Sequence, residues 1–305
     1  MGSPDLGLNS APRRSNPSPP VTTADNPSSS VIPAPPEAGH AGLVVGLADG
    51  ASAALRHSAQ SPLKLLVPRP RGESVWAYVS SFGGGLVAGD QTRLDLSVGA
   101  GSKLFVSTQA STKVYRNPGL RPCRHRTSAT VEAGSVLAFV PDAVQCFADS
   151  SYTQDQTFQL DATASLVLVD WLTAGRVARG ERWAFRSYRS RNDVFVDGER
   201  VFLDSIRLDA DDASPVGQRM GRFNCLASLL LIGPAVQPAA AKLLETIAAL
   251  PVPRRGELLV SASAIRGGAV LRLAGSGIEP VSQELRRHLA FLGALLGDDP
   301  LDRKF

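Results

Sequence analysis

Two sets of residues have the chemistry and spacing to suggest a site. Cys123 and His125 form a Cys-x-His pair, which places a thiol and an imidazole on the same face if the segment is a strand. Both groups bind transition cations such as zinc and nickel, although two ligands do not complete a site. Asp90, Asp142 and Glu181 are embedded in polar or glycine-rich stretches, and their carboxylates are further candidates to meet a hydrated cation. The sequence alone leaves the metal ligands open.

A carboxylate pair can also act as acid and base in hydrolysis. Asp90 with Asp142 is the pair to consider, so a carboxylate-dependent hydrolase is one alternative function. Ser111 and Lys113 offer a hydroxyl and an amine two residues apart, but no third group is set to orient them. The four histidines lie in unrelated contexts, and no serine-hydrolase, zinc-protease or paired-cysteine zinc pattern occurs. The residues therefore favour a protein that is not an enzyme.

The glycine cluster before Asp90 imitates a nucleotide-binding motif. Residues 83–88 read GGGLVA and fit G-x-G-x-x-A. That motif works only when a helix N-terminus follows the glycines and receives the pyrophosphate. Here the next residues, 90–98, alternate like a strand, so we expect a turn or bulge in which glycine lets two backbones approach closely.

The elements that position these residues are mostly strands. Apolar and polar residues alternate over 94–98 and 104–108, and the glycines at 99 and 101 between them predict a β-hairpin. Residues 127–131 and 135–140 predict a second strand pair, and Asp197-Gly198 predicts a tight hairpin. Helical spacing is limited to the last third, over 216–230, 243–250 and 280–296. The chain is therefore predicted to be mainly β, with two or three helices in the C-terminal third.

Four blocks in the sequence resemble the urease accessory protein D family, which is called H in some bacteria. They read SFGGGLVAGD (81–90), TQASTKVYR (108–116), VPD with Phe147 (140–147), and DWLTAGR with ARGE and WAF (170–185). Ala143 replaces the second proline that is usual in the third block. The resemblance covers roughly Gly42 to Leu296. The positions that it marks as motif or interaction residues are Gly83, Gly84, Gly85, Asp90, Thr108, Gln109, Ser111, Thr112, Lys113, Tyr115, Pro141, Asp142, Gly175, Arg176, Arg179, Gly180, Glu181 and Trp183.

The resemblance implies both a fold and a function. The fold would be a β-helix-like body of stacked sheet layers. The function would be that of a maturation chaperone for urease, which binds the urease apoprotein and the accessory proteins F and G. The G protein is a GTPase that carries nickel, and the chain would act as scaffold and conduit for nickel insertion. No cofactor would be permanently bound, and nickel would be held only transiently.

Composition narrows the partners and the compartment. The formal net charge is +4, and arginines cluster over 116–126 and 176–191. No aromatic residues alternate with them as a stacking platform, so the pattern disfavours nucleic acid and favours an arginine-rich protein interface. An interaction module without any metal role is therefore a second alternative. Three sparse cysteines, no apolar leader and no membrane-length apolar run favour the cytoplasm.

The chain divides by composition into two parts. Residues 1–40 hold nine of the 22 prolines and few apolar residues. Such a segment buries too little surface to offset its ordering entropy, so we predict a disordered tail. Residues 41–305 are predicted to form a single domain, whose content of apolar residues is sufficient for a sizeable core.

Overall fold

The computed structural model describes Gly2 and residues 39–69, 72–119, 121–252 and 254–302. The predicted tail over 1–40 falls outside these residues, apart from Gly2, Gly39 and His40. The folded body begins at residue 39. It is mainly β, as predicted, and its helices lie in the C-terminal part.

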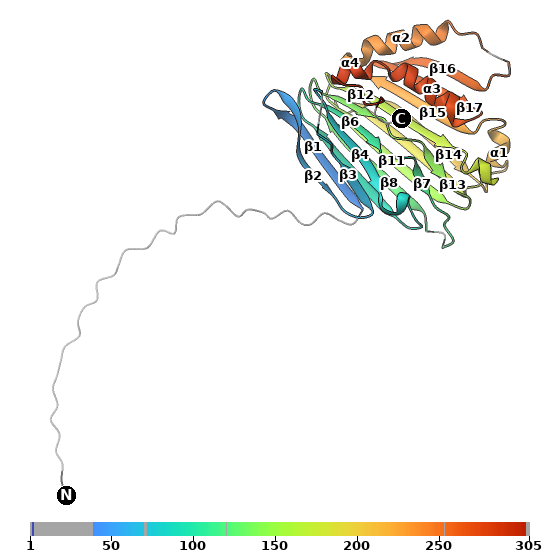
Figure 1. The fold of residues 1–305 in the computed structure, drawn as a ribbon, viewed down its shortest axis with the longest axis horizontal. Helices are drawn as coiled ribbons and strands as arrows, with labels where there is room; N and C mark the ends of the chain where they lie inside the picture. The colour runs from blue at the N-terminus through green and yellow to red at the C-terminus, as the bar shows by residue number, and fades with distance from the viewer. Residues whose placement is uncertain (1, 3–38, 70–71, 120, 253, 303–305) are drawn as a thin grey trace. The chain divides into compact units, whose positions relative to one another are not determined.

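Two sheets form the body (Figure 1). Sheet A has seven strands in the order β14-β13-β11-β8-β5-β1-β2, and sheet B has ten, eight of them in the order β16-β17-β15-β12-β9-β6-β4-β3. The strands of sheet A are β1 (His40–Ala48), β2 (Ala51–Ala59), β5 (Gln91–Val98), β8 (Cys123–Val131), β11 (Ser151–Leu160), β13 (Ser187–Val196) and β14 (Glu199–Asp209).

The strands of sheet B come from every part of the body. They are β3 (Leu63–Leu66), β4 (Val75–Ser81), β6 (Lys103–Thr108), β7 (Thr112–Val114), β9 (Val136–Phe139), β10 (Val144–Cys146), β12 (Ser165–Thr173), β15 (Cys225–Ile232), β16 (Leu258–Ile265) and β17 (Gly268–Gly275). The short strands β7 and β10 lie off the main path: β7 pairs with β10, and β10 pairs with β12.

The chain winds between the two sheets as a solenoid of about 4 turns. Strands β1, β5, β8, β11 and β13 are parallel neighbours in sheet A, and β4, β6, β9 and β12 are parallel neighbours in sheet B. The predicted β-hairpin over 94–108 is therefore wrong, because β5 belongs to sheet A and β6 to sheet B. The predicted pair over 127–140 is wrong for the same reason. Alternation identifies the buried face of a strand, but not the strand that pairs with it.

Antiparallel hairpins close the solenoid at both ends. The predicted turn at Asp197-Gly198 joins β13 to β14, and both residues have positive φ (49° and 77°), as a type I′ turn requires. A further antiparallel hairpin near the C-terminus joins β16 to β17. Strand β15 pairs with β12 on one side and with β17 on the other, which extends sheet B beyond the solenoid.

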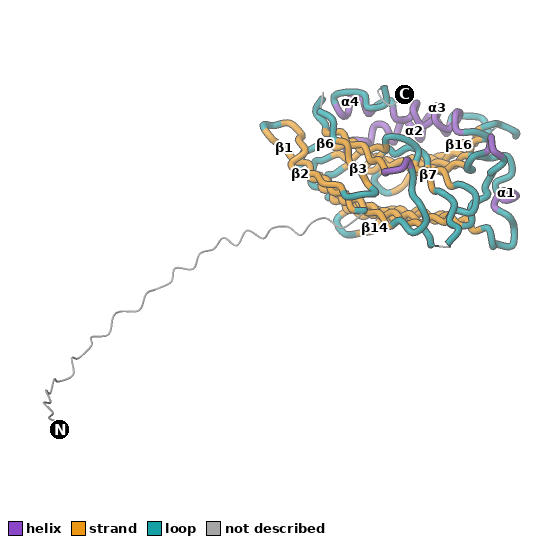
Figure 2. The backbone as a smooth tube through the Cα atoms, turned by 60° about the horizontal axis from the view of Figure 1, so that its bottom comes forward, coloured by secondary structure: helices purple, strands orange, loops and turns teal. Residues whose placement is uncertain are grey.

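Helices α2 (Gln237–Ala248), α3 (Ile278–Leu289) and α4 (Leu292–Leu296) cover the outer face of sheet B and make a third layer (Figure 2). The short helix α1 (Val216–Arg219) lies apart from this layer, and its Val216 packs in a cluster with Trp183 and Tyr188. Single 3₁₀ turns are η1 (Phe82–Gly84), η2 (Val177–Arg179) and η3 (Pro234–Val236). The helix predicted over 216–230 is wrong, since it ends at Arg219 and residues 225–232 form β15. This strand is covered on both faces, so it is apolar on both, and its pattern resembles that of a buried helix. Among the described residues, no helix is long and apolar enough to cross a membrane.

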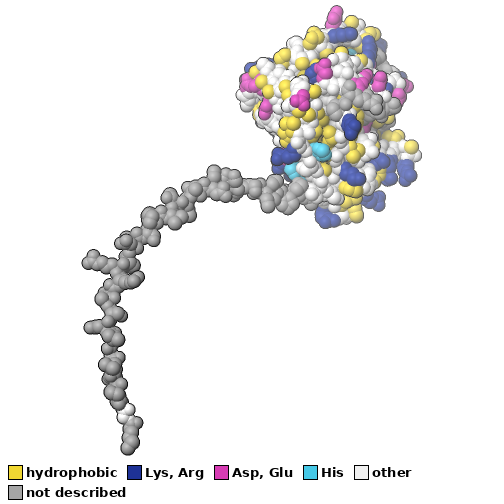
Figure 3. All heavy atoms as spheres, turned by 60° about the vertical axis from the view of Figure 1, so that its left-hand side comes forward, with side chains coloured by type: hydrophobic (Ala, Val, Ile, Leu, Met, Phe, Trp, Pro, Cys, Tyr) yellow, Lys and Arg dark blue, Asp and Glu magenta, His cyan; other side chains and the backbone are white. Residues whose placement is uncertain are grey.

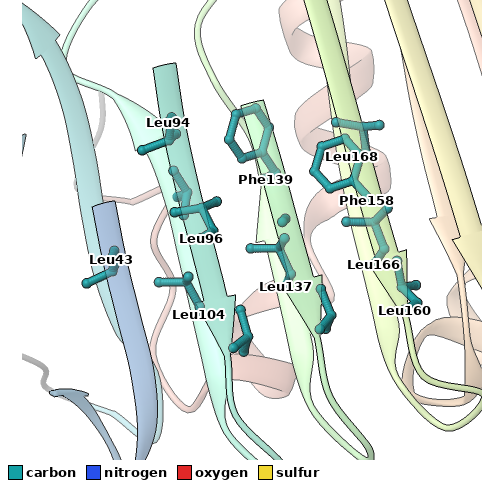
Figure 4. Close-up of a cluster of buried hydrophobic side chains, with 14 of the residues drawn as sticks. Leu43, Leu94, Leu96, Leu104, Leu137, Phe139, Phe158, Leu160, Leu166 and Leu168 are labelled. Atoms are coloured by element: carbon teal, nitrogen blue, oxygen red, sulfur yellow. The ribbon is translucent and has the colours of Figure 1, made fainter. Parts of the chain in front are cut away.

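The space between sheets A and B is filled largely by leucine, valine and phenylalanine. Leu96, Leu137, Phe158 and Leu166 belong to this inter-sheet apolar cluster, which Figure 4 shows. A second cluster joins sheet B to the helices, with Phe105 and Leu229 on the sheet and Leu243 and Leu285 on the helices. The two clusters fix the spacing of the layers, and with it the position of everything held between them.

Candidate functional site

A cavity of about 200 Å³ lies between the two sheets, beyond one end of the inter-sheet apolar cluster. Its wall comes from strand ends and from the loops that follow them. Predicted motif residues make up part of this wall: Gly84, Thr108, Gln109, Ser111, Thr112, Pro141 and Asp142. Asp170 and Trp171, at the start of the fourth block, also line it, so the solenoid brings parts of all four motif blocks, which lie far apart in the sequence, to one place.

Asp142 is fixed in the cavity wall by Thr108. The Thr108 hydroxyl donates to Asp142 Oδ2 (2.9 Å), and the Asp142 amide donates to Thr108 Oγ1 (2.8 Å). Thr108 ends β6, and Asp142 follows the neighbouring strand β9, so the parallel pairing of these strands sets the two side chains side by side. The Asp142 carboxylate is therefore held at the cavity wall, and one of its oxygens accepts a hydrogen bond from the uncharged Thr108 hydroxyl.

His125 also reaches the cavity, and it does so as a neutral imidazole. Its Nδ1 lies 2.8 Å from the Thr92 hydroxyl and its Nε2 3.2 Å from that of Thr127. Burial lowers the pKa of His125 to about 4, because the interior disfavours the charged ring. At neutral pH the ring can therefore offer a nitrogen lone pair to a cation, once the hydrogen bond between that nitrogen and its threonine hydroxyl is broken.

Cys123, the partner of His125 in the Cys-x-His pair, points elsewhere. Its thiol donates to the carbonyl of Val87 at 2.7 Å and is not among the residues that line the cavity. Burial raises the pKa of the Cys123 thiol, so it stays protonated. The two side chains share an inward face, as predicted, but only the imidazole faces the cavity.

The glycine-rich loop packs directly on the segment around β7. Leu86 exchanges backbone hydrogen bonds with this segment, donating to Lys113 and accepting from Tyr115. A Cβ on Gly85 would lie 2.7 Å from the Lys113 carbonyl oxygen and 2.8 Å from the Tyr115 ring, so only glycine fits. The Tyr115 hydroxyl donates to the carbonyl of Gly83 (3.1 Å). No helix follows the loop, in agreement with our rejection of a nucleotide site.

Asp90 closes that same loop rather than facing Asp142. Its carboxylate accepts from the Val87 amide at 2.8 Å, and its own amide donates to the Val87 carbonyl at 3.0 Å. Asp90 is not among the residues lining the cavity that Asp142 faces. The structure therefore does not bring this pair together in one cavity, as the hydrolase alternative requires.

The fourth motif block begins in β12, and the rest of it, from Ala174 on, forms a separate surface loop. Arg176 donates to both carboxylate oxygens of Glu181, and its guanidinium lies 4.1 Å from the centre of the Phe147 ring. Glu181 also accepts from the Ala148 amide (3.1 Å), and the hydrogen bond from Arg176 is the main reason that the pKa of Glu181 is lowered. The interactions of Glu181 thus serve to tie its loop to the chain before β11.

Backbone geometry explains the other motif residues of that loop. Gly175 has φ of +99°, and a Cβ there would lie 2.8 Å from the carbonyls of both Cys146 and Glu181. Gly180 ends η2 in the left-handed conformation, and Trp183 donates from Nε1 to the Phe223 carbonyl (3.0 Å). Arg179 is exposed. None of these residues lines the cavity.

The sequence reasoning missed a set of buried polar residues that we call the polar band. These side chains lie between the sheets beside the apolar cluster. The buried members of the band are Thr92, Gln154, Gln156, Asp170, Ser190 and Asn192, and the half-buried His125 adjoins them. A signal was available, because Gln154 and Gln156 share the inward face of β11 with Tyr152, Phe158 and Leu160. Two glutamines on an otherwise apolar face are unexpected in a core.

Asp170 stands at the centre of the polar band. It is 8% exposed, and it accepts from Ser190 Oγ (2.7 Å), Asn192 Nδ2 (2.8 Å) and Gln154 Nε2 (3.1 Å). All three donors are neutral and come from sheet A, whereas Asp170 belongs to β12 of sheet B. Burial raises the pKa of Asp170, and the hydrogen bonds from Ser190, Asn192 and Gln154 oppose this shift.

A second cavity, of about 500 Å³, opens beside β14, β16 and β17. Asp170 and Trp171 line this side cavity and the inter-sheet cavity alike. The ion pair between Asp204 and Arg272 (3.1 Å) also borders the side cavity. The buried carboxylate of Asp170 therefore belongs to the walls of both cavities.

The described residues hold no cluster of three or more His, Cys, Asp or Glu side chains that would cage a metal ion. The predicted candidates are dispersed: Asp142 and His125 at the cavity, Cys123 and Asp90 in the glycine-loop region, and Glu181 in the surface loop. Single oxygen and nitrogen ligands along a cavity suit weak, stepwise contacts with a cation rather than a permanent site.

The predicted arginine clusters lie mostly on the outside. Many of them pair with aspartates, for example Arg124 with Asp155 (3.5 Å) and Arg116 with Asp149 (3.1 Å). In the view of Figure 3, basic side chains predominate on the lower part of the body, and acidic side chains are concentrated on the upper part. Basic and acidic side chains are therefore partly segregated on this face of the body.

Comparison with known proteins places these features in a family. Residues 37–304 match the family model described as UreD urease accessory protein. The chain is 48% identical over 295 residues to urease accessory protein UreD of Sorangium cellulosum, covering 94% of this chain and 92% of the relative. It is 44% identical to UreD of an Anaeromyxobacter species (87% and 89% covered) and 31% identical to urease accessory protein D of Arabidopsis thaliana (85% and 98% covered).

Proposed function

The chain belongs to the UreD family of urease accessory proteins, and from this premise we propose that it delivers nickel to apo-urease as scaffold and conduit, without catalysing a reaction. The scaffold would hold the urease apoprotein together with accessory proteins F and G, the GTPase that brings the metal. Delivery would take place in the cytoplasm. The role in urease maturation follows from the family, whereas the metal, the route and the partners are our proposal.

The inter-sheet cavity is the observation that supports a role as a conduit for the metal ion. All four motif blocks contribute to its wall, and it presents ligands for a cation: the Asp142 carboxylate, the neutral His125 ring and side-chain amides. A cation needs ligands strong enough to replace part of its water shell, yet weak enough to release it. Dispersed single ligands meet this requirement better than a closed site of four.

The proposed scaffold role is supported by the exposed arginines of the outer surface. Arginine offers bidentate pairing with carboxylates, and such residues are enriched at protein interfaces. The surface loop that carries Arg179 and Val177 is held in shape by the Arg176–Glu181 pair, so it can present both exposed side chains to a partner.

The proposed function can be tested by co-expressing apo-urease and the accessory proteins F and G from one organism, with and without this chain. Affinity capture would report the partners, and a urease assay after growth in nickel would report delivery. We expect capture of urease and F, and activity that depends on this chain. No capture, with equal activity in its absence, would overturn the proposal.

One substitution separates conduit from scaffold. Asp142→Ala removes a carboxylate from the cavity wall, so we expect several-fold lower urease activation with partner capture and folding unchanged. The control is Asp149→Ala, which removes a carboxylate from an exposed ion pair and should leave activation unchanged. Full activation by Asp142→Ala would instead support an interaction module without a metal role.

A further inference from the structure

Strand β16 is an edge of sheet B that carries no charge (Figure 1). The main strand paths of the two sheets end in four edge strands, β2 and β14 of sheet A and β3 and β16 of sheet B. Three of these edges contain charged side chains, such as Arg56 in β2, Lys64 in β3 and Arg207 in β14. Residues 258–265 of β16 read LLVSASAI, and none of them is buried. Charged side chains and proline protect an edge from pairing with another chain, so β16 is the edge that lacks this protection.

The backbone groups that β16 presents at its free side follow from its pairing with β17. Among the described residues, β17 is the one strand that pairs with β16, and a two-residue turn joins them. The residues on either side of such a turn are hydrogen-bonded to each other. At the other end, the Ser276 amide donates to the Glu257 carbonyl at 2.7 Å. Because bonded and non-bonded residues alternate along an antiparallel pair, four residues direct their N–H and C=O groups to the free side. These are Leu258, Val260, Ala262 and Ala264.

We propose that β16 pairs with β16 of a second copy of this chain, antiparallel, about a two-fold axis at Ser261. A two-fold interface brings the same surface of both copies together. With the axis at Ser261, all four free residues of one copy lie opposite free residues of the other, so each can exchange backbone hydrogen bonds. Moving the axis along the strand leaves some of them without a partner. Sheet B would then continue from one copy into the other.

The side chains of β16 are complementary to one another in this register. Each large apolar side chain lies opposite a small one, which avoids crowding across the two strands. The opposed pairs are Leu258 with Ala264, Val260 with Ala262, Leu259 with Ser263, and Ser261 with itself. At each end of the paired strands, Glu257 of one copy comes next to Arg266 of the other, and both side chains are exposed in the single chain. Opposite charges therefore flank an uncharged strand, and no like charges of β16 are opposed.

Cysteine cross-linking tests the register. Cα atoms in a non-hydrogen-bonded antiparallel pair lie about 4.5 Å apart, which is within the range of a disulfide. We expect Ser261→Cys to form a covalent dimer with diamide, which takes up the two electrons and two protons that the two thiols lose. The native Cys123, Cys146 and Cys225 are buried and should not react.

Ser263→Cys is the matched control, because Ser263 is also an exposed serine on the same face of β16. The two copies of this residue would be displaced by about 13 Å along the strands, too far for a disulfide. We therefore expect little covalent dimer. Equal cross-linking of Ser261→Cys and Ser263→Cys would overturn the register.

The mass of the purified full-length chain in analytical ultracentrifugation tests the pairing without cross-linking. We expect about twice the chain mass of 32.1 kDa at micromolar concentration. Ser261→Asp sets two carboxylates directly opposite each other at the axis, so dimerisation should weaken about tenfold or more. Ser205→Asp is the control, because it adds the same charge at an exposed position of the edge strand β14, and it should dimerise like the wild type.

A monomeric wild-type chain would overturn the proposal, and the free edge would then be open to an extended segment of a different protein. A dimer in which Ser261→Cys does not cross-link, or which Ser261→Asp does not weaken, would overturn it as well. All of these measurements use the purified chain alone. The inference therefore does not rest on the proposed function, and its failure would leave that function untouched.

Discussion

The inter-sheet apolar cluster and the polar band occupy the same space between the same two sheets, yet they are built on opposite rules. Along β11 the inward side chains change from Gln154 and Gln156 to Phe158 and Leu160. Along β12 they change from Leu166 and Leu168 to Asp170. The parallel stacking aligns these changes from turn to turn, so each kind of side chain forms a continuous layer.

The apolar cluster and the polar band differ in how much they stabilise the folded chain. The apolar cluster gains free energy from every buried side chain, at about 25 cal/mol per Å². The polar band gains little net free energy, because each of its hydrogen bonds replaces one to water. The polar band therefore contributes less to stability than the apolar cluster beside it.

Removing a large side chain from the apolar cluster should have the largest effect on stability. Phe158 is fully buried and packs edge-to-face on Phe139, with ring centres 5.8 Å apart. We expect Phe158→Ala to lower the free energy of unfolding by about 3–5 kcal/mol, from lost burial and the cavity left behind. Urea unfolding measures this, and Gln159→Ala, at the exposed position next to it, should stay within about 0.5 kcal/mol. A loss below about 1 kcal/mol would show that the two regions do not differ in packing.

In the polar band, the largest effect should be a dependence on pH through His125. Its pKa is near 4 in the folded chain and near 6.5 when unfolded, so unfolding takes up a proton between these values. Stability is then fully present above pH 6.5 and is lost as pH falls toward 4. From the 1.36 kcal/mol that corresponds to each pKa unit, the wild type should lose about 2 kcal/mol more than His125→Gln between pH 7 and pH 5.

Urea unfolding of both proteins at the two pH values measures this difference. Other groups that titrate in this range contribute equally to both proteins and cancel in the comparison. Parallel pH profiles for wild type and variant would mean that the ring is accessible to protons in the folded chain.

The strands of both regions were predictable from local alternation, but their partners were not. The period of two over residues 94–98 shows which side chains face inward, and this holds for β5. A β-hairpin and a turn between two sheets of a solenoid have the same local sequence pattern, because glycines such as those at 99 and 101 allow the chain to reverse direction in both. The difference is decided by parallel pairing with strands such as β1 and β8, which lie dozens of residues away.

The candidate site was predictable only in part. The resemblance marked Thr108 and Asp142, and these two side chains do meet at the cavity. Asp170 was visible only as part of a motif block, because its burial and its donors come from β11 and β13 of the other sheet. Local sequence gives the type of an inward residue, whereas tertiary pairing decides whether it joins a polar layer.

The smallest effect should come from replacing a hydrogen-bonding member of the polar band by an apolar residue of similar volume. Gln156 donates to Asn192 Oδ1 at 2.7 Å, and it is 3% exposed. Gln156→Met keeps the volume but leaves that oxygen without its donor, so we expect a loss of about 1 kcal/mol in urea unfolding. A loss of several kcal/mol, as at Phe158, would contradict the separation of the two regions, since it would make the polar band as important for folding as the apolar cluster.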